Sequence, residues 1–182
     1  MIKLETERLI IRNFKSDDWK DIAVIAMDYE QSEYAIYDHG PWPSNQEEYK
    51  GIAEWFVKGD DFAAILLKEE EKLIGWIAKG KIENKENAYN LGYIFHSSFH
   101  GKGYASESCK AIIKYIFEEL QADEIITGTG KLNIPSNKLL KRLGFSKTGE
   151  TKQAFRKDGK GNPIEFVGVD YRLSRDEWQE QI

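Results

Sequence analysis

The feature that most constrains the fold is a strand-like run that passes through a glycine turn into an amphipathic helix. The run covers residues 90–96, the turn reads FHGKGYASE over 99–107, and apolar side chains recur at helical spacing over 104–120. The first N–H groups of a helix have no partner inside it, and the helix dipole makes that end positive. Glycines let an anion come close to the backbone. The sequence therefore predicts a binding site for a phosphate-bearing ligand at this turn.

Three kinds of phosphate-binding loop can be compared with this turn. A nucleotide-hydrolysing P-loop requires GxxxxGK(S/T), which the chain lacks. A dinucleotide-binding loop requires GxGxxG near the start of a βαβ unit, but Ser106 stands where the third glycine belongs and the turn lies in mid-chain. The string HGKGYA instead resembles the Q/R-x-x-G-x-G/A loop with which GNAT N-acetyltransferases bind the pyrophosphate of acetyl-CoA. A plain glycine turn that caps a helix is the alternative.

Other motifs resemble the ribosomal-protein alanine/serine acetyltransferase branch of that family, the RimJ/RimL-like type. In chain order they are TERLIIR at 6–12, LGY at 91–93, GYASE at 103–107, NIPSN at 133–137, LGF at 143–145 and YRLSRDEW at 171–178. The resemblance implies an α+β GNAT fold, with a mixed, mostly antiparallel twisted sheet flanked by helices, over a single domain of residues 1–182. It also implies acetyl-CoA as the cosubstrate.

Periodicity and turn signals predict the same mixed α+β order of elements. Helices are expected from Ser16, from a capping box formed by Ser44 and Glu47, over 104–120 and over 135–143. A long polar and aromatic loop is expected over 28–43. Strands are expected over 2–14, 62–68, 73–83, 90–96, 123–129, 145–151 and 164–173, with a hairpin loop or a disordered tip over 156–163.

Composition narrows the class of partner. The chain has 182 residues, of which 41% are hydrophobic, enough for one globular domain with a full core. Its net charge of −5 argues against nucleic acid as the main partner.

The single Cys109 excludes an internal disulfide and is expected to be a buried small hydrophobe. No apolar run is long enough to span a membrane and no signal-peptide pattern is visible, so a cytoplasmic protein is expected. Homodimerisation stays open, and no metal site is predicted.

The resemblance assigns cofactor contacts to a strand, to the glycine turn and to a later helix start. The strand would lie along the pantetheine arm and give a backbone N–H to the acetyl oxygen, through Tyr93, Ile94, Phe95 and His96. The turn would hold the pyrophosphate, through His100, Gly101, Lys102, Gly103, Tyr104, Ala105 and Ser106. Asn133 would hydrogen-bond the pantetheine arm.

Acetyl transfer to an amine needs a neutral amine, donors to the carbonyl oxygen and a proton for the leaving thiolate. Direct attack in a ternary complex needs no covalent intermediate. Many family members place a tyrosine as the acid where this chain has Leu140, so the resemblance points to Ser136 as the thiolate donor. The alternative is that Ser136 only caps its helix.

The general base is not assigned by the sequence. Asn90 stands where the family pattern has an acid, and a carboxamide cannot accept a proton at neutral pH. Glu107 is expected to stabilise the helix dipole instead. His96 and His100 titrate in the useful range but are expected to be strand-end or loop residues. Water or a carboxylate from elsewhere would then take the proton.

The acceptor is expected at the loop over 28–43, where acids lie beside aromatics, as a cationic amine prefers. Glu33, Tyr34 and Asp38 are the predicted contacts, and a solvated loop with its aromatics on the core is the alternative. The expected function is acetyl-CoA-dependent N-acetyltransfer to a primary amine, on a protein N-terminus or a small molecule. The alternatives are a non-catalytic acyl-CoA-binding module or sensor, and an enzyme that uses a longer acyl-CoA.

Overall fold

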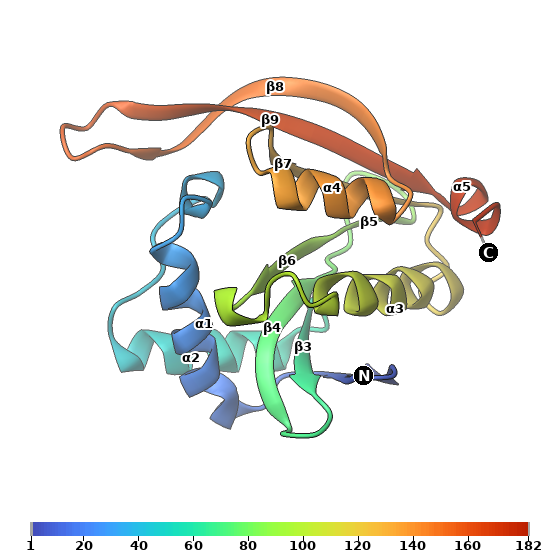
Figure 1. Ribbon diagram of the computed structural model, residues 1–182, viewed down its shortest axis with the longest axis horizontal. Helices are drawn as coiled ribbons and strands as arrows, with labels where there is room; N and C mark the ends of the chain where they lie inside the picture. The colour runs from blue at the N-terminus through green and yellow to red at the C-terminus, as the bar shows by residue number, and fades with distance from the viewer. Residues whose placement is uncertain (1, 182) are drawn as a thin grey trace.

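The computed structural model describes residues 2–181, so the ends of the predicted domain, residues 1 and 182, lie outside it. Within these residues two β-sheets form the centre of the molecule (Figure 1). The first sheet is antiparallel throughout, in the strand order β1 (Lys3–Glu5), β2 (Leu9–Arg12), β3 (Phe62–Leu67), β4 (Lys72–Ala78) and β6 (Gly92–Phe95).

The second sheet is smaller and mixed. Its strand order is β5 (Ala88–Asn90), β7 (Glu124–Gly130), β9 (Pro163–Ser174) and β8 (Ser146–Lys157). The pair β5–β7 is parallel, and the other pairs are antiparallel. The mixed, mostly antiparallel α+β architecture predicted from the sequence is confirmed.

Helices α1 (Trp19–Glu30) and α2 (Gln46–Lys58) cover one face of the first sheet, and α3 (Tyr104–Glu118) covers the other. Helix α4 (Ile134–Arg142) lies against the second sheet, and α5 (Arg175–Gln179) follows the end of β9 (Figure 1). Alternate side chains of a strand point to opposite faces. On β3, Ala64 and Leu66 accordingly join the core beneath α1 and α2, whereas Ala63 and Ile65 join the core beneath α3. Cys109 is fully buried in the α3 core, as expected of a small hydrophobe.

The predicted strand over 90–96 is wrong in one respect, because it is divided between the two sheets. Leu91 stays with the second sheet: its N–H donates to Ile126 O (3.1 Å), and Thr127 Oγ1 donates to its carbonyl (2.6 Å). Gly92, the next residue, pairs with Ala78 in the first sheet. The two sheets therefore separate after Leu91 and leave facing edges of β6 and β7 unpaired with each other. This separation creates the space for a site.

Other boundaries also differ from the predictions. The expected strand over 2–14 is a hairpin of β1 and β2. The expected loop over 28–43 contains the end of α1 and a 3-10 turn, η2 (Ala35–Tyr37). The cap of α2 is not the predicted Ser44 but Asn45, whose side chain accepts from Glu48 N (3.0 Å). Both tertiary pairing and a one-residue shift of the cap lie beyond what local periodicity specifies.

The last two strands form a long hairpin that closes at residues 158–162, in agreement with the predicted hairpin loop. In Figure 1 this hairpin, drawn orange to red, extends toward the end of α1, drawn blue. No helix among residues 2–181 is long and apolar enough to cross a membrane. In the same range no group of three or more His, Cys, Asp and Glu side chains is arranged to hold a metal.

Candidate active site

A cavity of about 580 Å³ opens between β6, the turn before α3, the start of α4 and the end of α1. Most of the predicted cofactor residues line it: Tyr93, Ile94, Phe95, His100, Gly101, Gly103, Tyr104, Ala105, Ser106 and Asn133. Ser136 and Tyr34 line it too. His96 and Lys102, also predicted, are not among the lining residues.

The turn before α3 has the geometry of an anion site. Gly101 and Gly103 have φ of 73° and 85°, a region that glycine adopts without strain. The first helical bond of α3 runs from Glu107 N to Gly103 O (3.0 Å), so the N–H groups of residues 104–106 find no partner among the described residues. The start of α4 differs, since Asn133 Oδ1 caps it by accepting from Ser136 N (3.2 Å). The free donors of α3 therefore face the cavity uncapped.

Glu107 fastens this turn to the first hairpin. Its Oε1 accepts from Thr6 Oγ1 (2.6 Å) and Arg8 N (2.9 Å), and its Oε2 accepts from Arg8 Nε (2.7 Å). Arg8 Nη1 donates to Lys102 O (2.9 Å), and its guanidinium lies 4.5 Å from the ring centroid of Tyr104. We call Thr6, Arg8 and Glu107 the N-terminal clamp. The sequence analysis missed the role of Arg8, which lies far from the turn in sequence.

The pKa of Glu107 is lowered. Burial acts to raise it, but the hydrogen bonds from Thr6 and Arg8 and the charge of Arg8 outweigh burial. Both oxygens of this ionised carboxylate are engaged by Thr6 and Arg8, so its observed contacts are those of a group that positions the turn.

Both histidines near the turn are bonded to the backbone. His100 Nε2 lies 2.8 Å from Phe95 O, and His96 Nδ1 accepts from Ser98 N (3.2 Å). His96 lies beside Asp28. The carboxylate of Asp28 accepts from both Ser97 N and Ser97 Oγ (2.7 Å each). Burial acts to raise the pKa of Asp28, but these two bonds outweigh it and the pKa is lowered. The histidines thus shape the strand end, as expected for loop residues.

Strand β6 presents backbone donors to the gap between the sheets. His96 N donates to Ile74 O (3.0 Å), and hydrogen-bonding directions alternate along an antiparallel strand. The N–H groups of Tyr93 and Phe95 must therefore point away from β4. They face the side from which β7 has separated, so a ligand in the cavity can accept from them.

A hydroxyl pair lies within the cavity. Tyr93 Oη and Ser136 Oγ are 2.7 Å apart, and either can donate. Burial raises the pKa of Tyr93, so its hydroxyl stays protonated at neutral pH. Asn133, not Ser136, caps α4, which removes the alternative reading of the serine as a cap. The sequence analysis assigned Tyr93 only a strand contact and missed its hydroxyl, because the pair joins residues 43 apart.

A second cavity of about 410 Å³ lies on the other side of the separation point, where Leu91 and Gly92 form part of its wall. Asn90 lines it, and its Oδ1 accepts from Gly80 N (2.8 Å). The carbonyl oxygen of this carboxamide is thus already engaged. Asp170 is the one carboxylate among the residues that line this cavity.

The predicted acceptor contacts are not brought together. Tyr34 lines the first cavity, whereas Glu33 and Asp38 line neither of the two. The carboxylate of Asp38 accepts from His39 N (2.9 Å) and from Trp42 Nε1 (3.1 Å) within its own loop. Their role in acceptor binding stays a prediction.

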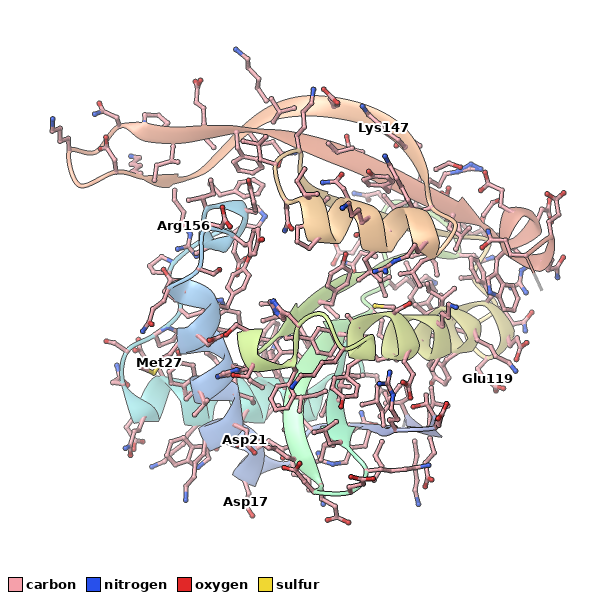
Figure 2. All side chains as sticks on the ribbon, viewed as in Figure 1. Asp17, Asp21, Met27, Glu119, Lys147 and Arg156 are labelled. Carbon is pink, nitrogen blue, oxygen red and sulfur yellow. The ribbon has the colours of Figure 1, made fainter. Side chains whose placement is uncertain are left out.

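Arg156 joins the long hairpin to the end of α1 (Figure 2). Its guanidinium donates to both carboxylate oxygens of Glu30 (2.5 and 3.1 Å) and to the carbonyls of Asp38 (3.1 Å) and Gly40 (2.7 Å). Such bidentate pairs are among the stronger ion pairs. The contact fixes the loop over 31–40 against β8. Nothing in the local sequence indicates it, because Glu30 and Arg156 are 126 residues apart.

Comparisons with known proteins agree with this geometry. A family model described as an acetyltransferase (GNAT) domain matches residues 8–146. The uncharacterized N-acetyltransferase YnaD of Bacillus subtilis is 31% identical over 156 residues, which cover 85% of this chain and 88% of that protein. The [ribosomal protein uS5]-alanine N-acetyltransferase of Escherichia coli is 28% identical over 169 residues, covering 87% and 85%.

Solved structures share the fold. The crystal structure of a GNAT-family acetyltransferase from Bacillus anthracis has a TM-score of 0.80 at 24% identity, with 96% of this chain and 99% of that chain covered. The structure of RimL, a ribosomal L7/L12 alpha-N-protein acetyltransferase in complex with coenzyme A, has a TM-score of 0.80 at 18% identity, with 97% and 99% covered.

Proposed function

This chain belongs to the GNAT acetyltransferase family, and from that premise we propose that it transfers the acetyl group of acetyl-CoA to a primary amine by direct attack in a ternary complex. It is an N-acetyltransferase of the RimJ/RimL-like type that uses acetyl-CoA. A relative is named as a [ribosomal protein uS5]-alanine N-acetyltransferase, and the acceptor of this chain would belong to the broader class of primary amines.

The observation that carries the proposal is the uncapped start of α3 at the wall of the 580 Å³ cavity. A side chain at Gly101 would meet no atom within 4 Å, so a phosphate can approach this backbone freely. Arg142 lines the same cavity, and its guanidinium brings donors to the region. These features fit the pyrophosphate of coenzyme A, which residues 100–106 would hold.

Strand β6 would hold the thioester end of the substrate. The outward N–H groups of Tyr93 and Phe95 can donate to the pantetheine amide and to the acetyl oxygen, on which negative charge develops during attack. Donors fixed in a strand need little reorganisation as this charge appears. Asn133 lines the cavity beside them and would contribute its amide N–H₂, since its Oδ1 is bonded to Ser136 N.

The hydroxyl pair would supply the proton for the leaving thiolate. As the amine nitrogen forms its bond to the acetyl carbon, the bond from carbon to sulfur breaks and the thiolate needs one proton. Ser136 Oγ would give this proton and take one from Tyr93 Oη, which lies 2.7 Å away, and Tyr93 would regain a proton, through water, from the nitrogen as the amide forms. A buried tyrosine with a raised pKa stays protonated until the thiolate forms, so Ser136 is the proposed catalytic residue and Tyr93 its partner.

Calorimetric titration of acetyl-CoA and of CoA tests the cofactor site, with Gly103→Glu as the loss-of-binding variant. Gly103 has φ of 85°, so glutamate there is strained and also places a negative charge where the phosphate would lie. Gly159→Glu is the matched control, because this glycine has no positive φ and a Cβ there meets no atom within 4 Å. We expect binding in the wild type and the control, and none in Gly103→Glu.

Thiol release from acetyl-CoA, measured with a panel of primary amines, then tests the transfer itself. Amine-dependent release with the N-acetyl product in equal amount supports direct transfer. Tight binding of acetyl-CoA without release for any primary amine would overturn the proposal and leave an acyl-CoA-binding protein.

A further inference from the structure

The second cavity holds a carboxylate that the proposed chemistry has not used. Asp170 of β9 is half-buried, and its carboxylate has no hydrogen-bond or ion-pair partner among residues 2–181. The nearest cation along its strand, Arg172, lies instead within 4 Å of Glu124 and Glu177. A half-buried carboxylate without a partner loses hydration and gains nothing in return, so it favours a cationic ligand.

The direction of this side chain follows from its strand. Its neighbours Val169 and Tyr171 are buried in the core, and the Tyr171 hydroxyl donates to Asn137 of α4 (2.7 Å). Successive side chains alternate between faces, so Asp170 points to the face away from α4. The start of α4 lines the cofactor cavity, so Asp170 lies on the face of the second sheet opposite that wall.

No side chain flanks Asp170 at the paired positions of the neighbouring strands. Its cross-strand neighbours are Gly128 in β7 and Gly149 in β8, and side chains at paired positions share a face. A Cβ at either glycine would lie 3.5–3.7 Å from a carboxylate oxygen of Asp170. Gly128 lines the cavity, so the carboxylate is open to the cavity across β7, and Gly149 leaves its other flank without a side chain.

Aromatic side chains form the outer wall of the same cavity. Tyr37 and Phe166 meet edge to face with ring centroids 5.0 Å apart, and Phe155 lies 5.2 Å from Phe166 and stacks on His39 at 4.0 Å. Aromatic faces attract cations and cover apolar stems. The contact between Arg156 and Glu30 holds the loop that carries Tyr37 and His39 in this position.

The cavity also reaches the point where chemistry would occur. Gly128 is two residues from Ile126, whose carbonyl bonds Leu91 N, and Leu91 and Gly92 line the cavity directly before Tyr93. Asp170 is paired with Gly128, one strand spacing of about 4.8 Å away, and the edge of β6 lies beyond the gap that opens where the two sheets separate. An amine bound in the cavity at this gap would lie between the carboxylate and β6, and its proton would pass to the carboxylate directly or through one water.

We propose that Asp170 binds the ammonium group of the acceptor and takes its proton, the role that Asn90 cannot fill, and that the acceptor is a slender cationic primary amine with an apolar or aromatic stem. The role given to Asp170 rests on the proposed function, acetyl transfer to a primary amine. The carboxylate removes one proton from the ammonium, and the neutral nitrogen bonds to the acetyl carbon as the bond from carbon to sulfur breaks. As the amide forms, its nitrogen loses a second proton, which passes through water to the hydroxyl pair of Tyr93 and Ser136 and replaces the one that Ser136 gives to the thiolate. Asp170 returns the first proton to water.

The experiment compares Asp170→Asn with the matched control Glu165→Gln, an exposed carboxylate of β9 that falls on the other face by alternation. Two amines are assayed by thiol release at pH 7: 2-phenylethylamine, which is cationic, and 4-ethylaniline, which is neutral. For the cationic amine we expect kcat/KM of Asp170→Asn to fall about 100-fold. The neutral amine needs no prior deprotonation and should lose much less. Acetyl-CoA affinity and melting temperature should match the control.

Gly128→Val is the second variant, because it keeps the carboxylate but places a side chain beside it. We expect its KM for 2-phenylethylamine to rise at least tenfold with acetyl-CoA binding retained. Equal losses for both amines, no loss in Asp170→Asn, or a loss of acetyl-CoA binding in that variant would overturn the assignment.

Amine binding is also measured without turnover, by titrating 2-phenylethylamine into the complex with CoA. Binding to the wild type that is lost in Asp170→Asn supports the site even if no thiol is released, and such a result would count against the proposed function alone. No binding to the wild type would overturn the Asp170 site, even where acetyl-CoA still binds.

Discussion

Replacing Glu107 with glutamine tests whether the N-terminal clamp holds the glycine turn. Glutamine keeps one carbonyl oxygen, which can still accept from Thr6 Oγ1 and Arg8 N, but it turns an N–H₂ group toward the guanidinium of Arg8. A hydrogen bond to a charged group contributes about 1.5–3 kcal/mol, and solvent screening reduces this value near the surface. We therefore expect Glu107→Gln to lower the free energy of unfolding by about 1.5 kcal/mol. In a chain of this size such a change lowers the melting temperature by about 3–6 °C.

The stability difference between the wild type and Glu107→Gln should become smaller as the pH falls. Because the folded pKa of Glu107 lies below its unfolded value, the unfolded state binds more protons in the acid range. The contribution of the carboxylate is then complete above the unfolded pKa of about 4.3 and disappears as the pH falls through the folded pKa. The difference in free energy of unfolding between wild type and variant should be constant from pH 8 to pH 6 and should become smaller at acid pH.

Thermal and urea unfolding of Glu107→Gln, followed at several pH values, measures this difference. The control is Glu118→Gln, on the same helix, where the carboxylate is 46% exposed and lies 3.8 Å from Lys114. An exposed pair of this spacing contributes less than about 0.5 kcal/mol. The reasoning fails if Glu107→Gln is no less stable than the control, or if its difference from the wild type stays the same at pH 3.

The remaining predictions concern the cofactor cavity and the hairpin. Ser136→Ala should lower kcat about 100-fold with little change in the Kd of acetyl-CoA, and steady-state kinetics with calorimetry would contradict this if the Kd rose as much as kcat fell. Gly103→Ala should cost about 1–2 kcal/mol of stability, because φ is 85° and the new Cβ lies 3.2 Å from Arg8 Nη2, and it should weaken acetyl-CoA binding; an unchanged melting temperature refutes the strain. Arg156→Lys should lower the melting temperature and raise KM for the amine, because lysine cannot keep both the bidentate contact with Glu30 and the hydrogen bonds to the two loop carbonyls. Unchanged values in both assays would show that the contact is dispensable.

Features fixed by local backbone preference could be predicted from the sequence. The turn around Gly101 and Gly103 followed by an amphipathic helix is one, since positive φ and helical periodicity are properties of neighbouring residues. The strands of the β3–β4 hairpin and the long final hairpin are others. Together with the motifs, these elements were enough to predict the α+β fold and most residues that line the first cavity.

Features that depend on a distant partner were missed or misplaced. The strand over 90–96 has no local sign of its division, because the break depends on the pairing of Leu91 with Ile126 and Thr127 across the gap. The clamp joins residues about 100 apart, and the hydroxyl pair of Tyr93 and Ser136 joins residues 43 apart. The sequence indicated each residue type but not which others it would meet.

Asp170 shows most plainly what the sequence determined and what tertiary structure decided. By itself the sequence predicted a strand over 164–173, in which alternation, a local property, puts residue 170 on the less apolar face. Only the folded chain placed Gly128 and Gly149 on either side of it and left its charge unpaired beside a cavity. The physical reason is that the register between strands is set by packing of whole elements, and no short segment of chain contains that information.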